Sequence, residues 1–149
     1  MILGFTGTRA GLTLEQREGL AAVFAVLPDQ LMHGGAVGAD TEFDEWYRSV
    51  GWGAITKIDI YPATPARSEF WNFRYAGIGF AWLTIHEPMP PLERNEIIAR
   101  KCDHLLACPA EPVERFRGGT WATVRYARAA GKPITKLLPD GTIERERAR

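Results

Sequence analysis

Three glycine-rich turns contain the residues whose types and spacing best suit chemistry. Each follows a short apolar run, and they are residues 6–9 (Thr-Gly-Thr-Arg), 33–40 (His-Gly-Gly-Ala-Val-Gly-Ala-Asp) and 117–120 (Arg-Gly-Gly-Thr). Glycine permits a tight turn and lets a ligand approach the main chain closely. A helix that begins after such a turn offers unpaired N–H groups and the positive end of its dipole, which favour an anion such as phosphate. Three such turns in 149 residues predict a pocket for a phosphorylated ligand.

The first turn is not a standard cofactor fingerprint. It contains neither G-x-G-x-x-G nor G-x-x-x-x-G-K-[ST], which argues against an ordinary NAD site and against a P-loop ATPase. The hydroxyls of Thr6 and Thr8 are candidate donors to a phosphate or ribose, and Arg9 offers a fork for an anion. The alternative is a plain strand-to-helix connection with a solvated arginine.

The second turn is almost free of side chains and ends in a carboxylate. Gly34, Gly35 and Gly38 form the bare loop, and Asp40 follows them. Asp40 either binds a ribose hydroxyl or caps the helix that follows, as does Thr41 if the helix starts one residue later. His33, just before the loop, either contacts a ligand or is a histidine with satisfied hydrogen bonds at a strand end.

Apolar runs and helical spacings alternate along the chain and define the elements that must position these turns. The expected strands are 2–5, 31–33, 55–61, 105–108 and 133–138, and the expected helices are 13–27, 40–50, 92–101 and 120–130. This alternation predicts one α/β domain over 1–149: a Rossmann-like, doubly wound, mainly parallel sheet of about five strands with helices on both faces. In that fold the first and fourth expected strands flank the ligand crevice, and all three turns share its edge.

Two segments do not follow the alternation. Residues 62–91 are rich in aromatics, with six of them between Phe70 and Trp82. They form core or dimer packing, a lid that stacks on a nucleobase, or a platform for single-stranded nucleic acid. Residues 140–149 form a charged tail, of which 144–149 are expected to be frayed.

Composition narrows the function classes. Eighteen basic and eighteen acidic residues cancel, which argues against a nucleic-acid partner. No apolar stretch approaches the roughly 20 residues that span a membrane, and the N-terminus lacks a secretory pattern, so we expect a cytoplasmic protein without a membrane partner. Cys102 and Cys108 are expected to be ordinary buried thiols; with His104 between them a metal site is conceivable, but the spacing fits no common zinc pattern. We therefore predict no metal and no cofactor.

Together, these motifs resemble the SLOG superfamily. The residues that carry the resemblance are Gly7-Thr8-Arg9, Gly34-Gly35-Ala36-x-Gly38-Ala39-Asp40, Arg94-Asn95 and Gly118-Gly119-Thr120. The superfamily includes the LOG phosphoribohydrolases, the DNA-processing protein DprA and the YpsA-like proteins. The resemblance covers roughly residues 1–61 and 92–138. It implies a Rossmann-like fold that binds nucleotides or nucleotide derivatives, often as a homodimer or a higher homo-oligomer.

The resemblance to the LOG enzymes is incomplete at their catalytic motif. Glu93-Arg94-Asn95 matches their Glu-Arg-Lys element except at Asn95, and residues 110–117 are inserted before the third glycine turn. The family's catalytic glutamate falls on Thr123, Arg125 or Tyr126, none of which is a carboxylate. N-glycoside cleavage develops positive charge on the ribose, which a carboxylate stabilises. The carboxylates that remain as substitutes are Asp40, Glu42 and Glu93.

We therefore predict binding of a nucleotide or nucleotide-derived ligand, such as a nucleoside monophosphate or an ADP-ribose-like compound. The alternative is a phosphoribohydrolase that cleaves nucleoside 5′-monophosphates to base and ribose 5-phosphate, with Arg94 and Asp40 as catalytic residues. Arg94 pairs with a phosphate or belongs to a surface ion pair. A DNA-handling role, as in DprA, is a third possibility that the neutral charge disfavours. The predicted ligand-binding residues are Gly7, Thr8, Arg9, Gly34, Gly35, Gly38, Asp40, Arg94, Asn95, Gly118, Gly119, Thr120 and Thr123.

Overall fold

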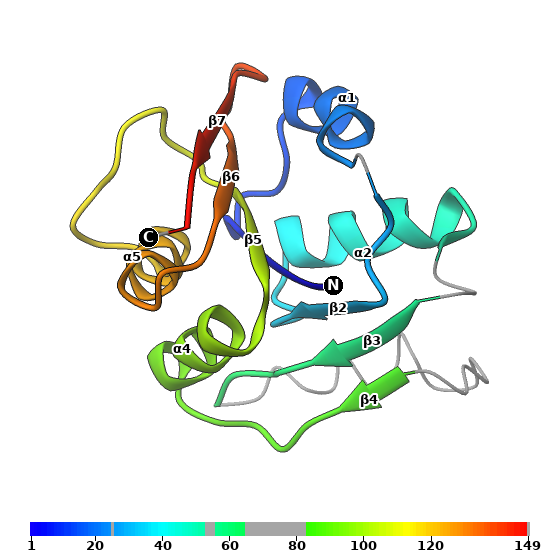
Figure 1. The fold of residues 1–149 in the computed structure, drawn as a ribbon, viewed down its shortest axis with the longest axis vertical. Helices are drawn as coiled ribbons and strands as arrows, with labels where there is room; N and C mark the ends of the chain where they lie inside the picture. The colour runs from blue at the N-terminus through cyan, green and yellow to red at the C-terminus, as the bar shows by residue number, and fades with distance from the viewer. Residues whose placement is uncertain (25, 53–55, 65–82, 149) are drawn as a thin grey trace.

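The chain folds into one sheet covered by helices on both faces (Figure 1). The computed structural model describes residues 1–24, 26–52, 56–64 and 83–148. The strands are β1 (Ile2–Gly7), β2 (Gln30–His33), β3 (Lys57–Ile60), β4 (Leu83–Ile85), β5 (His104–Cys108), β6 (Ile134–Leu137) and β7 (Ile143–Glu146). The helices are α1 (Leu14–Val23), α2 (Ala39–Ser49), α4 (Pro91–Lys101) and α5 (Gly119–Ala129).

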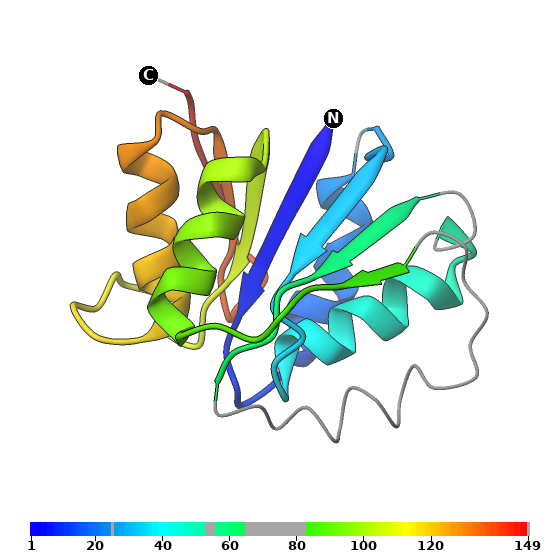
Figure 2. The same ribbon diagram turned by 90° about the horizontal axis from the view of Figure 1, so that it is seen from below.

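The strand order of the sheet is β4-β3-β2-β1-β5-β6-β7. The described strand pairs are parallel except for β6 with β7. Helices α1 and α2 pack on one face and α4 and α5 on the other (Figure 2). The strand order reverses between β1 and β5, so the predicted doubly wound, mainly parallel α/β arrangement is confirmed.

The apolar runs of β1 and β5 place side chains alternately on the two faces. Phe5 of β1 lies under α2, where its ring stacks on Phe43 with centroids 4.0 Å apart. On β5, Leu106 contributes to this same core, whereas Leu105 packs with α4 and α5 on the opposite face. Because both faces are covered, these central strands are mainly apolar. Their polar residues are Thr6 of β1 and His104 of β5.

The prediction of about five strands is wrong, because the sheet has seven. One extra strand, β4, lies within the segment 62–91, and the other, β7, lies in the charged tail. The expectation of a frayed tail over 144–149 is therefore wrong for residues 144–146, which belong to β7 and pair with β6. The charged side chains of β7 form ion pairs that the sequence spacing did not predict. Glu146 pairs with Arg128, and Lys136 pairs with Glu144 and Glu146. The predictions for the aromatics from Phe70 to Trp82 lie outside the described residues.

The observed boundaries of two helices differ from the expected ones. Thr13 forms the expected capping box with Gln16, but α1 ends at Val23 rather than at residue 27. At α2 the expected cap is wrong: Gly38 occupies the N-cap position, with φ +97°, and no side chain caps the helix. Neither Asp40 nor Thr41 caps it, because both lie inside its first turn and their side chains bond to Ala36 in the preceding loop.

The ion pairs of β7 predict a pH-dependent contribution to stability. Hydrogen bonds from Arg128, assisted by Lys136, lower the pKa of Glu146 to about 2 from its ordinary value of 4.5. Because the folded-state pKa is depressed, this stabilisation is present above pH 4.5 and is lost as the pH falls toward 2. The pair is partly solvated, so we expect less than about 1 kcal/mol. Urea unfolding between pH 5 and 2.5 should show a shallower loss of stability in Glu146→Gln than in the parent protein; equal slopes would contradict the assignment.

Within the described ranges, no helix is long and apolar enough to cross a membrane.

Candidate functional site

A cleft of about 750 Å³ opens at the carboxyl ends of β1 and β5, where the strand order reverses. Four parts of the chain line it. They are the end of β1 with Gly7, Thr8 and Arg9; the β2–α2 loop with Gly34, Ala36 and Asp40; α4 with Arg94 and Asn95; and the β5–α5 loop and α5, with Glu111, Phe116 to Thr120 and Arg125. All three glycine turns thus reach one cleft, as expected.

The start of α5 is open to this cleft. Gly118, with φ +115°, precedes the helix, and α5 has neither a side-chain cap nor an acidic residue in its first turn. The first helical bond runs from the N–H of Ala122 to the carbonyl of Gly118. Within the described chain, the N–H groups of residues 119–121 have no partner, and a Cβ on Gly118 would meet nothing within 4 Å. The start of α5 therefore presents these N–H groups to the cleft, a geometry that favours an anion.

The second turn differs, because the protein itself occupies the start of α2. The N–H of Ala39 donates to the carbonyl of Thr8 at 2.9 Å, and Asp40 accepts a bond from the N–H of Ala36 at 3.1 Å. Gly38 lets the first loop approach so closely, since a Cβ there would overlap the carbonyl of Arg9. Gly35 donates its N–H to His33. These contacts tie the first two turns together instead of opening them to a ligand.

The first turn places its residues at the cleft without starting a helix. Helix α1 begins seven residues after Gly7, behind the cap at Thr13. Gly7 is required by packing, since a Cβ there would overlap that of Ala39. The hydroxyl oxygen of Thr8 accepts a bond from the N–H of Ala10 at 3.2 Å, which leaves its proton available to the cleft. This turn therefore supplies a hydroxyl and the cation of Arg9.

Arg94 is buried at the cleft, so the surface ion-pair alternative is wrong. Its side chain crosses over Gly34, where a Cβ would overlap the guanidinium. One terminal nitrogen donates to the carbonyl of Tyr61 at 3.1 Å, and Nε is buried with no partner among the described residues. Burial lowers the pKa of Arg94, and the charge of Arg9 acts in the same direction, while Asp40 opposes both. A cation that is so poorly compensated would gain from an anionic ligand.

Asp40 is the predicted carboxylate that does reach the cleft. Burial raises its pKa, against the opposing influence of His33, Arg94 and the N–H groups of Ala36 and Gly34. A buried carboxyl group with a raised pKa can hold or release a proton close to a ligand.

The other two substitute carboxylates are elsewhere. Glu42 accepts the N–H of Leu12 and pairs with Arg17, and Glu93 is exposed outside the cleft lining.

Three predicted ligand-binding residues lie near the N-terminus of α5: Asn95, Thr120 and Thr123. Asn95 lines the cleft and donates to the carbonyl of Gly119 at 3.3 Å, which ties α4 to the start of α5. Thr120 also lines the cleft. Thr123 is fully buried, donates to the carbonyl of Gly119 at 2.8 Å and is not part of the lining. Its predicted ligand contact is therefore not seen, and its hydroxyl instead bonds within the helix.

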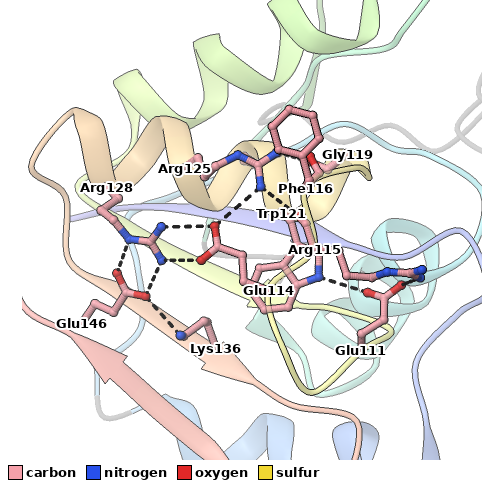
Figure 3. A network of polar contacts seen from close by, with 11 residues as sticks. Glu111, Glu114, Arg115, Phe116, Gly119, Trp121, Arg125, Arg128, Lys136 and Glu146 are labelled. Carbon is pink, nitrogen blue, oxygen red and sulfur yellow. Dashed lines mark hydrogen bonds and ion pairs between the residues drawn. The ribbon is translucent and has the colours of Figure 1, made fainter.

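Sequence reasoning missed the contribution of the inserted loop over 110–117. Glu111 lines the cleft and accepts bonds from the indole N–H of Trp121 and from Arg115, both at 3.0 Å (Figure 3). Phe116 and Arg125 line it as well. The only available signal was the insertion itself, since it stands directly before the glycines of the third turn.

The remaining candidates have structural roles. His33 is fully buried; its Nδ1 accepts from Gly35, so its Nε2 proton donates to Asp44. Cys102 and Cys108 are buried and unpaired, as expected, and burial raises the pKa of both thiols, that of Cys102 to about 11. Over the described residues, no three His, Cys, Asp or Glu side chains are grouped to hold a metal ion.

No protein-family model, curated protein or solved structure matches this chain. By its fold the chain is an α/β protein with a mainly parallel sheet, and its cleft lies where the strand order reverses. The SLOG resemblance stays a prediction.

Proposed function

We propose that this protein binds a nucleotide or a nucleotide-derived ligand, with a phosphate at the start of α5. The observation that carries the proposal is the N-terminus of α5, which faces the cleft with three N–H groups that have neither a cap nor another partner among the described residues. A helix start of this kind favours a phosphate through both its N–H groups and its dipole.

The charges that line the cleft support an anionic ligand. Four arginines contribute to the lining: Arg9, Arg94, Arg117 and Arg125. They face two carboxyl groups, of which Asp40 has a raised pKa and Glu111 is already engaged by Arg115 and Trp121. The described lining therefore has an excess of positive charge, although the whole chain is neutral.

Calorimetric titration of the purified protein with AMP, ADP-ribose and inorganic phosphate tests this proposal. We expect measurable binding of at least one of the two nucleotides and competition by phosphate. A folded protein that binds none of the three would overturn it.

Arg94 provides a sharper test through Arg94→Met. We expect AMP affinity to fall about 30-fold, because a charge-assisted bond is worth about 2 kcal/mol. Folding stability should change by no more than about 1 kcal/mol, because the substitution removes a buried cation but leaves the Tyr61 carbonyl without its partner. Arg100→Met on the same helix is the matched control, since Arg100 is exposed and pairs with Glu96. Equal effects of the two substitutions on affinity would contradict the role of Arg94.

A second candidate function is favoured by Asp40. Its buried carboxyl group lines the same cleft as Arg94 and α5, so it is a candidate for the acid or base that N-glycoside cleavage needs. Incubation with nucleoside 5′-monophosphates should then release free base and ribose 5-phosphate, and Asp40→Asn should stop the release. Binding of AMP without release of adenine would leave the first proposal alone standing.

The resemblance also leads us to propose a homodimer. Light scattering on the purified protein gives the mass directly, and a mass of one chain at all concentrations would exclude it.

A further inference from the structure

The inserted loop places one aromatic ring at the mouth of the cleft. Phe116 is 91% exposed, although it lines the cleft next to the start of α5. Figure 3 shows its ring beside the guanidinium of Arg125, above the polar network of the loop. The ring is therefore not used in the core of the protein, and its face is accessible from the cleft.

This position is held by specific contacts. Arg125 donates to the carbonyl of Arg115 at 2.9 Å and to that of Phe116 at 2.8 Å, and its guanidinium lies 6.0 Å from the ring centroid. The same loop is tied to α5 a second time, because Arg128 bonds to Glu114 (Figure 3). The backbone that carries the ring is thus fixed before any ligand binds.

We propose that Phe116 is the stacking surface for the aromatic base of the nucleotide whose phosphate lies at the start of α5. This inference rests on the proposed function and specifies a ligand with a flat aromatic group. Phe116 and Gly118 are two residues apart, a span of at most about 7 Å of extended chain, so one ligand can touch the ring and the helix N–H groups together. Base–aromatic stacking accepts any base, because every base has a π-face.

The surroundings of the ring favour a small ligand over a second copy of the chain. Its neighbours in the loop, Glu114, Arg115 and Arg117, are charged and exposed. The cores of protein interfaces are depleted of charge and bury about 800 Å² on each partner. A single ring among charges fits a base better than it fits such a core.

A comparison of AMP with ribose 5-phosphate tests the inference, because the second compound lacks the base. The parent protein should bind AMP at least about tenfold more tightly than ribose 5-phosphate, as expected for one stacked base. Phe116→Ala should remove about tenfold of AMP affinity and leave ribose 5-phosphate unchanged, whereas Phe116→Trp should retain AMP binding. Val113→Ala is the matched control: Val113 is exposed in the same loop but is not part of the lining.

The outcomes separate the two proposals. If the parent protein binds ribose 5-phosphate but gains nothing from the base, or if Phe116→Ala leaves AMP affinity unchanged, the inference is overturned and the proposed function stands. If the folded parent protein binds none of AMP, ADP-ribose, ribose 5-phosphate and inorganic phosphate, both proposals fail. If Phe116→Ala converts a dimer to a monomer in light scattering without changing AMP affinity, the ring belongs to an interface and the inference is again overturned.

Discussion

Gly119→Asp is expected to abolish nucleotide binding while leaving the protein folded. Gly119 is the first residue of α5, and a Cβ there meets only the amide of Asn95 at 3.4 Å, an ordinary contact. The new carboxylate would occupy the site of the phosphate at the helix N–H groups. It would also repel the negatively charged phosphate of the ligand. We expect AMP affinity to fall about 100-fold or more. Thermal unfolding should show equal or greater stability, because an acidic residue in the first turn contributes about 0.3–1 kcal/mol.

Two control variants test whether the effect of Gly119→Asp comes from the charge of the new side chain, from its size or from its position. Gly119→Asn adds a side chain of similar size without charge, and we expect it to lose less than about fivefold in affinity, since it brings no repulsion. Leu14→Asp places the same carboxylate at the first residue of α1, whose start is capped by Thr13 away from the cleft, and should leave affinity unchanged. If Gly119→Asp binds AMP as well as the parent protein does, the phosphate is not at α5.

Among glycine-to-alanine substitutions in the three glycine turns, Gly38→Ala is expected to lower the free energy of unfolding most. Gly38 has φ +97°, and its missing side chain makes room for the carbonyls of Thr8 and Arg9. An alanine must therefore tolerate an unfavourable φ and push apart two loops joined by the bond from Ala39 to Thr8. We expect a loss of about 3 kcal/mol in the free energy of unfolding, from strain of about 1–2 kcal/mol and overpacking of similar size. Urea unfolding measures it.

Gly51→Ala is the matched control for this prediction. Gly51 also has a positive φ, +87°, but a Cβ there meets no described atom within 4 Å. In Gly51→Ala the free energy of unfolding should fall only by the cost of the strained φ, about 1 kcal/mol. Equal losses for the two variants would show that the close approach of the two loops contributes nothing.

Gly38→Ala should also weaken nucleotide binding, because the loops it separates carry Arg9 and Asp40 at the cleft. This loss of affinity would accompany a loss of stability, whereas Gly119→Asp should lose affinity without any loss of stability. The two substitutions therefore distinguish a glycine needed for packing from a glycine needed by the ligand, although both belong to the same motif pattern in the sequence.

The sequence predicted the part of the fold that local patterns control. Alternating apolar runs and helical spacings identified the central strands and four helices, and the capping box at Thr13 marked the start of α1 correctly. Strand β7 was missed because its residues are charged, and charge in a terminal segment normally indicates solvation. Its strand character depends on Arg128 and Lys136, which lie close only after the chain has folded.

The sequence by itself determined that three glycine turns meet at one edge of a parallel sheet, because strand order and loop position follow from the alternation. Only the tertiary structure decided which turn is open. The start of α2 is occupied by the carbonyl of Thr8, whereas the start of α5 is not occupied by any described group. It also decided that Arg94 is buried above Gly34 and that Phe116 stands at the mouth of the cleft. Such differences depend on contacts between residues far apart in the chain, which local sequence patterns do not encode.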